Sequence, residues 1–115
     1  MPYLSIQTNV ELPGAKQSVL LKAASKLLSE QLGKPEDYVM AAIEPPAQMI
    51  FAGSIAPTAF LSVKSIGLPD AKLKPLSAAL CSLLKEHAGI VQDRVYIEFN
   101  NAQGKNWGFD GDTFG

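Results

Sequence analysis

Several features that would place the chain in a special class of protein are missing from its 115 residues. The single cysteine, Cys81, rules out an internal disulfide and a Cys-x-x-Cys metal or redox motif. We expect Cys81 to be a small buried apolar residue on a helix. Ten Lys and Arg against eleven Asp and Glu leave a net charge of −1, without a basic run for nucleic acid.

Long apolar segments are missing too. The apolar stretches are far too short to span a bilayer, and the first residues lack the basic and apolar regions of a signal peptide. We therefore expect a cytoplasmic protein that binds neither nucleic acid nor membrane, although export by a non-classical route stays open. With 47% hydrophobic and 18% charged residues, the composition is that of an ordinary globule, and we expect a single domain over residues 1–115.

The pattern of apolar residues predicts two similar halves. In the first, alternation over residues 3–7 indicates a strand, a 3.6-residue stripe over about 15–32 a helix, and alternation over 39–43 a second strand. In the second, residues 59–64 and 95–100 alternate in the same way around a helix that runs from about Leu73 to His87. Gly33 and Gly89 are suited to end the two helices.

The two halves also have similar residues at corresponding positions, with a spacing that is nearly the same for both matching segments. Leu4-Ser5-Ile6-Gln7-Thr8 resembles Leu61-Ser62-Val63-Lys64-Ser65, and Glu36-Asp37-Tyr38-Val39 resembles Gln92-Asp93-Arg94-Val95. This agreement favours an internal duplication. Each half should be a right-handed β-α-β unit, because that is the hand such crossovers take. The predicted fold is α/β, a four-stranded mixed sheet with two helices on one face.

Such a sheet has one face without helices. Tyr3, Met40, Phe60 and Tyr96 would lie on it among polar residues. An uncovered, partly apolar face and open edge strands favour pairing with further copies of the chain. The alternative is a monomer whose sheet has one solvated face.

Short motifs give the chain a family resemblance along essentially its whole length. They are Met1-Pro2 before a strand that ends Thr8-Asn9, then Gly33-Lys34-Pro35, Ser65-Ile66-Gly67, Asp93-Arg94-Val95-Tyr96-Ile97 and Asp112-Thr113-Phe114. In this order and spacing the chain resembles the macrophage migration inhibitory factor (MIF) family of the tautomerase superfamily. The resemblance implies a duplicated β-α-β fold, a homotrimer, and three active sites at the subunit interfaces.

Pro2 is the predicted catalytic residue. After removal of Met1, its nitrogen would be a secondary amine, and burial or a nearby cation would lower its pKa towards neutrality. Such a base can take a proton from a carbon beside a carbonyl and return it elsewhere. If Met1 is retained, the same nitrogen is a tertiary amide without basicity. From the residues alone, Pro2 could equally just begin an edge strand.

The resemblance assigns roles to further residues. Lys34 would bind a substrate carboxylate or carbonyl oxygen, Ile66 would offer its backbone amide, and Tyr96 would bound the pocket from the neighbouring subunit. Glu98 would contact substrate where the animal members have an asparagine, and its carboxylate would disfavour an anionic substrate or raise the pKa of Pro2. Candidates for the other pocket walls are Tyr38, Trp107, Phe109 and Phe114, which could instead seal a core or subunit contact.

The resemblance implies an isomerase, a keto–enol tautomerase of phenylpyruvate-like 2-oxo acids or of dopachrome-like compounds, without metal or other cofactor. Arg94 is the chain's only arginine, and we expect it to face solvent or a subunit contact rather than to extend the chemistry. Two alternatives stay open. One is a cytokine-like signalling protein, with an unknown receptor and a weakly active or vestigial pocket, and the other is a ligand-binding module without turnover.

Overall fold

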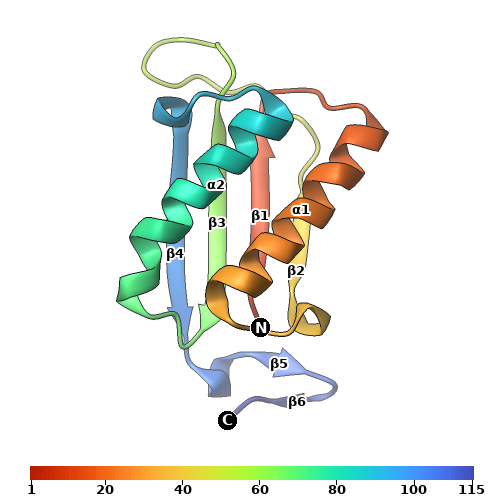
Figure 1. The fold of residues 1–115 in the computed structure, drawn as a ribbon, viewed down its shortest axis with the longest axis vertical. Helices are drawn as coiled ribbons and strands as arrows, with labels where there is room; N and C mark the ends of the chain where they lie inside the picture. The colour runs from red at the N-terminus through yellow and green to blue at the C-terminus, as the bar shows by residue number, and fades with distance from the viewer.

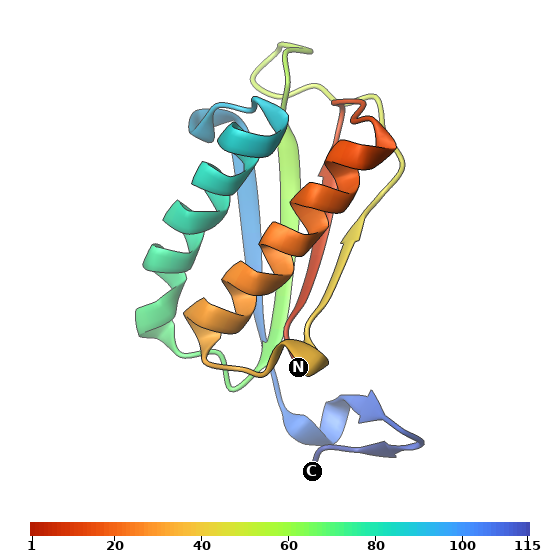
Figure 2. The same cartoon turned by 45° about the vertical axis from the view of Figure 1, so that its right-hand side comes forward.

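A computed structural model describes residues 1–115 and has the predicted α/β architecture (Figure 1). In chain order the elements are β1 (Tyr3–Thr8), α1 (Gly14–Leu32), β2 (Met40–Ile43), β3 (Ala59–Ile66), α2 (Leu73–Ala88), β4 (Val95–Ala102), β5 (Gly108–Phe109) and β6 (Asp112–Thr113). Strands β1 to β4 form one sheet in the order β2-β1-β3-β4, and β5 pairs with β6 as a small hairpin. The β1–β2 and β3–β4 pairs are parallel and the central β1–β3 pair is antiparallel. Both helices lie on the same face of this sheet (Figure 2).

The core confirms that the two halves are equivalent. Its helical residues include Leu20, Ala24 and Leu28 from α1, and Leu76, Leu80 and Leu84 from α2 at matching positions. Each α2 residue lies 56 positions after its α1 counterpart (76 − 20 = 56), in agreement with the offset of the sequence repeat. The inward-facing residues of β1 and β3 meet these helices and are shielded from water, which is the main favourable contribution to folding.

The opposite face of the sheet carries large exposed side chains, as expected. Met40 is 65%, Tyr96 61% and Phe60 38% exposed in the single chain. Cys81 is buried on α2, and burial raises the pKa of its thiol, which fits its predicted role as a small apolar core residue. Neither helix has the combination of length and hydrophobicity that a bilayer crossing requires.

The segment between β2 and β3, residues 44–58, is the longest connection and lies at the end of the sheet away from the chain's N-terminus (Figure 1). Phe51 and Ser54 exchange two backbone hydrogen bonds of 3.0 Å across a tight turn at Ala52 and Gly53. Nothing in the sequence indicated the contacts that Arg94 makes. This half-buried residue donates from its guanidinium to carbonyls of this segment in its own chain, and whether it also meets another subunit stays a prediction. Carbonyl groups left free by an irregular segment attract the five N–H groups of an arginine.

Candidate active site

A cavity of about 280 Å³ lies at the end of the sheet where β1 begins, next to the predicted catalytic residue. Three segments far apart in sequence line it, namely Met1, Pro2 and Tyr3, then Asp37, Tyr38, Val39 and Met40, and finally Trp107, Gly108, Phe109 and Phe114. The structure therefore brings Pro2 together with all four predicted aromatic wall residues. Asp37 and Met40 also line the cavity, and the alternation pattern around them gave no functional signal.

Backbone bonds fix Pro2 at the floor of this cavity. Its side chain is buried, and its carbonyl accepts a hydrogen bond of 3.0 Å from the Met40 N–H, which joins the start of β1 to β2. Proline suits this position, since it has no N–H to donate to the sheet. The alternative that Pro2 begins an edge strand is wrong, because β1 lies between β2 and β3. The nitrogen that would become a free terminus thus lies at the end of a central strand, and the strand sets its position.

The aromatic wall is built from the short helix Glu36–Tyr38 and the C-terminal segment. The Phe109 ring meets the Tyr38 ring edge-on at 5.7 Å and stacks on the Phe114 ring at 5.4 Å. The Phe114 N–H donates to the carbonyls of Gly104 and Trp107, at 3.1 and 3.2 Å, and so closes the hairpin end. A Cβ at Gly104 would meet the Phe114 carbonyl oxygen at 3.0 Å, so a glycine permits this close approach.

The electrostatics of the cavity favour an uncharged amine at the terminus. In the chain with Met1 in place, burial and secondly the ammonium of Lys34 lower the pKa of the Met1 α-amino group below its ordinary value. Lys34 is held just beyond α1. Gly33 is left-handed at φ 62°, the N–H groups of Gly33 and Lys34 both donate to the Ser29 carbonyl, and the Ser29 hydroxyl donates to the Lys34 carbonyl. The predicted cation is therefore near the predicted base, although it does not line the cavity.

The other predicted site residues do not line the cavity within one chain. Ile66 is nevertheless at the Pro2 end of the sheet, because Lys64, two residues before it, pairs with Tyr3. Ile66 ends β3, half-buried, beside Ala102. Tyr96 pairs with Phe60, which in turn pairs with Gln7 at the far end of β1. Gln7 is five residues from Pro2, which corresponds to about 16 Å along a strand.

Glu98 lies on the same exposed face as Tyr96 and accepts a 3.3 Å hydrogen bond from the Asn100 amide. Within one chain, neither Tyr96 nor Glu98 can contact a substrate bound at Pro2. Their assignment to the site requires a second copy of the chain.

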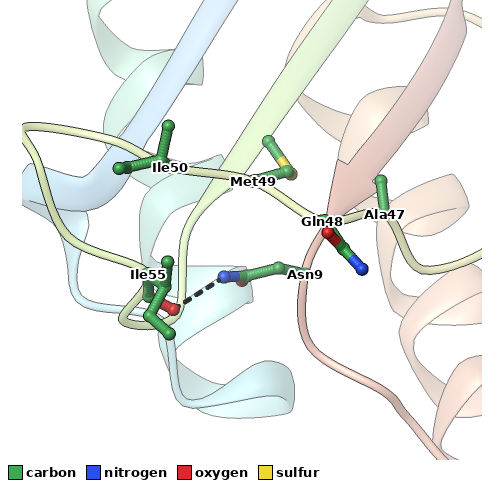
Figure 3. Close-up of a pocket in the computed structure, with 6 residues that line it drawn as sticks. All are labelled: Asn9, Ala47, Gln48, Met49, Ile50 and Ile55. Carbon is green, nitrogen blue, oxygen red and sulfur yellow. Dashed lines mark hydrogen bonds between the residues drawn. The ribbon is translucent and has the colours of Figure 1, made fainter.

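A second hollow, of about 530 Å³, lies at the opposite end of the sheet (Figure 3). Asn9, Ala47, Gln48, Met49, Ile50 and Ile55 line it. The Asn9 amide donates to the Ile55 carbonyl at 3.0 Å, at the edge of the hollow. No titratable side chain lines it, so we place acid–base chemistry in the smaller cavity at Pro2. Nor do any three His, Cys, Asp or Glu side chains of the chain cluster as metal ligands would.

Comparison with known proteins agrees with this architecture. The family model described as macrophage migration inhibitory factor matches residues 1–115. The chain belongs to the macrophage migration inhibitory factor family. The family resemblance drawn from the sequence motifs is confirmed.

Relatives within the family match over full length. The homologue of Brugia malayi is 38% identical over 116 residues, covering 100% of both chains, and the factor of Meriones unguiculatus is 34% identical over 99% of both. Among solved structures, the homologue from Prochlorococcus marinus has a TM-score of 0.92 at 38% identity and covers 98% of this chain and 99% of its own. The factor from Trichinella spiralis has a TM-score of 0.88 at 33% identity, covering 97% and 99%. The matches therefore include both the first and the last segments that build the cavity.

Proposed function

We propose that the chain is a MIF-like tautomerase in which Pro2, after removal of Met1, is the catalytic acid and base. The observation that carries this proposal is the environment of the terminus. A buried proline opens onto an aromatic cavity, and burial together with Lys34 lowers the pKa of the Met1 amine one residue before it. We expect the same two causes to act on the Pro2 amine once Met1 is removed. A base must be neutral at the working pH to accept a proton. The match to the MIF family supports the same chemistry.

The proposed reaction is the interconversion of keto and enol forms of a phenylpyruvate-like 2-oxo acid, or of a dopachrome-like compound. The Pro2 nitrogen takes the proton from the carbon beside the carbonyl, and the electron pair of that C–H bond moves to form the enolate. The protonated nitrogen then returns the proton to the carbonyl oxygen, so no atom is gained or lost. Lys34 would anchor the substrate anion, the Ile66 amide would bind it, and the aromatic wall would hold its ring.

A homotrimer belongs to this proposal, because Tyr96 and Glu98 are too far from Pro2 of their own chain. The exposed sheet face that carries them supports an interface with other copies. Light scattering should give three times the chain mass of 12.3 kDa. A monomer at the assay concentration would remove both residues from the site.

The test of the catalytic proposal compares the processed protein with its Pro2→Gly variant on the enol of phenylpyruvate, followed by ultraviolet absorbance. The glycine of this variant keeps a primary amine, which is less rigidly placed than the ring nitrogen of proline. A general base contributes roughly 100-fold or more, so we expect kcat/KM to fall by a large part of that factor. Val19→Ala, an exposed position on α1, is the matched control and should leave the rate unchanged. Equal rates for wild type and Pro2→Gly would exclude a catalytic need for the proline ring, and blocking the terminal nitrogen then decides whether the amine is the base.

Glu98 is the observation that favours the second candidate, a cytokine-like protein with a weak or vestigial pocket. Its exposed carboxylate lies two residues from Tyr96 on the same face, so it would face the anionic substrate wherever Tyr96 lines the site. Under this alternative, turnover is slow and binding to a protein receptor does not depend on Pro2. Pro2→Gly would then leave cell-surface binding of the labelled protein intact while removing any residual turnover.

A further inference from the structure

The Phe51 ring lies between Tyr96 and Arg94, a contact that the proposed chemistry does not use. Its centroid is 4.7 Å from that of Tyr96, with the two planes tilted by 43°, and the Arg94 guanidinium carbon lies 5.3 Å from the Phe51 ring centroid. Tilted aromatic pairs and a guanidinium over a ring are both favourable geometries. Tyr96 is mostly exposed in the single chain, so few neighbours restrain its ring. The contact with Phe51 is the aromatic contact that limits the positions of this ring.

Phe51 is in turn held by backbone contacts that converge on Arg94. The guanidinium donates four hydrogen bonds to carbonyl oxygens of the 44–58 segment, to Phe51 at 3.1 Å, Ser54 at 3.0 Å, Ala56 at 3.0 Å and Pro57 at 2.9 Å. Few other side chains could satisfy four carbonyls, because only arginine presents a planar fork of donors. These bonds fix the backbone of Phe51, and the guanidinium over the ring favours one position of the ring itself.

Asn9 ties the same segment from β1. Its amide nitrogen donates to Ile55 and Ala56, its amide oxygen accepts from the Thr58 N–H at 2.9 Å, and Figure 3 shows the bond to Ile55. The Thr58 hydroxyl also donates to the Arg94 carbonyl at 2.7 Å. The segment beneath Phe51 is therefore fixed from both sides.

We infer that Phe51 and Arg94 are positioning residues for Tyr96, holding its ring in the orientation in which it lines the neighbouring subunit's pocket. This inference rests on the proposed function, since Tyr96 reaches a site only in another copy. An exposed tyrosine that must be ordered on binding loses rotamer freedom at that moment. A ring already fixed by Phe51 avoids most of that loss, and the substrate binds more tightly.

The experiment measures the dissociation constant of phenylpyruvate by quenching of Trp107, the chain's only tryptophan and a lining residue of the cavity. Phe51→Leu removes one aromatic pair, so we expect binding to weaken about 3- to 10-fold, with kcat changed less than about twofold. Phe51→Tyr keeps the ring and should bind like wild type. Light scattering on each variant reports the assembly.

Arg94→Lys retains the positive charge but not the planar set of guanidinium donors. If Phe51→Leu changes the assembly, this variant tests the positioning role instead. We expect it to weaken binding in the same direction. The double variant should be no weaker than Phe51→Leu alone, because both substitutions act through one ring.

Two results would overturn the inference. One is an unchanged dissociation constant in Phe51→Leu and Arg94→Lys with the assembly intact, and the other is full additivity in the double variant. The same assay separates this failure from failure of the proposed function. Suppose that the wild type binds phenylpyruvate but shows no Pro2-dependent turnover, and that Phe51→Leu binds it less tightly. This result would contradict the proposed enzyme and support the positioning role. Wild type that neither binds nor converts the acid would overturn both.

Discussion

The two ends of the sheet are built in different ways. At the end with Pro2, the chain's termini and the exposed β5–β6 hairpin enclose an aromatic cavity, and the contacts are mainly between rings. At the other end, a network of side chain-to-backbone hydrogen bonds from Arg94 and Asn9 fixes an irregular segment. Under the proposed function, the first end carries the base of the chain's own site and the second presents Tyr96 to another copy. Reactive groups and rigid support therefore lie in separate regions of one chain.

The largest effect should come from blocking the terminal nitrogen at the Pro2 end of the sheet, with the other end left unchanged. Inserting one lysine between Met1 and Pro2 keeps the initiator residue and leaves the Pro2 nitrogen as an amide. We expect turnover to fall to background, because an amide nitrogen cannot accept the proton. Mass spectrometry verifies the retained residues, and an unchanged melting temperature verifies the fold. Wild-type turnover in this variant would rule out the imino base.

Lys34→Gln should affect only the Pro2 end. Loss of a charged hydrogen bond to the substrate should lower kcat/KM for a 2-oxo acid about tenfold. Lys34 lowers the pKa of the Met1 amine in the unprocessed chain. We expect it to act in the same direction on the Pro2 amine, so Lys34→Gln should raise the pKa of that amine. The base is then protonated up to a higher pH, and the acid limb of the kcat/KM profile shifts to higher pH.

The control for this substitution is Lys22→Gln, on the exposed side of α1. It removes the same charge far from the cavity and should change neither the rate nor the profile. If the pH dependence of kcat/KM for Lys34→Gln coincides with that of wild type, Lys34 does not influence the pKa of the base.

Glu98→Gln should have a smaller effect and should raise kcat/KM. Glu98 lies on the sheet face that also carries Tyr96. Two like charges a few ångströms apart in a solvated site repel by about 1 kcal/mol. Removing the carboxylate should therefore raise kcat/KM for phenylpyruvate by about 2- to 5-fold. The methyl ester of the same acid carries no charge and should show no gain. An equal gain for acid and ester would mean that Glu98 acts by some means other than charge.

Much of the fold was predictable, because its determinants are local and repeated. Apolar residues at helical spacing appear twice at one offset, and both sets became the core. Apolar and polar residues alternate clearly along the strands, and this pattern predicted both the sheet and its face without helices. In the site, Pro2 and the four aromatic residues were found through the family motifs, and the structure brings them together in one cavity.

The remainder depended on contacts between segments with no pattern of their own. Arg94 was expected to face solvent or a subunit contact, and nothing in the sequence shows that residues 51–57 would present four carbonyls to it. Asp37 lines the cavity from the short helix Glu36–Tyr38 and Met40 from the start of β2, and neither residue's chemistry marks it as part of a site. Tyr96 and Glu98 could not be tied to Pro2 from periodicity, because the sheet separates them from it within the chain.

The smallest predicted effect tests the rigidity of the loop end directly. Ala52 has a φ of 53°, a left-handed conformation that is unfavourable for any residue with a Cβ. Ala52→Gly removes that strain but adds freedom to the unfolded chain, so the net gain should be below about 1 kcal/mol. The same substitution at Ala78, exposed on α2, should instead lower stability by about 0.5–1 kcal/mol. Urea unfolding at matched protein concentration measures both. If Ala52→Gly instead lowers the free energy of unfolding, the left-handed conformation costs Ala52 little. The added freedom of the unfolded chain then outweighs the strain, and contacts in the turn hold the backbone in place.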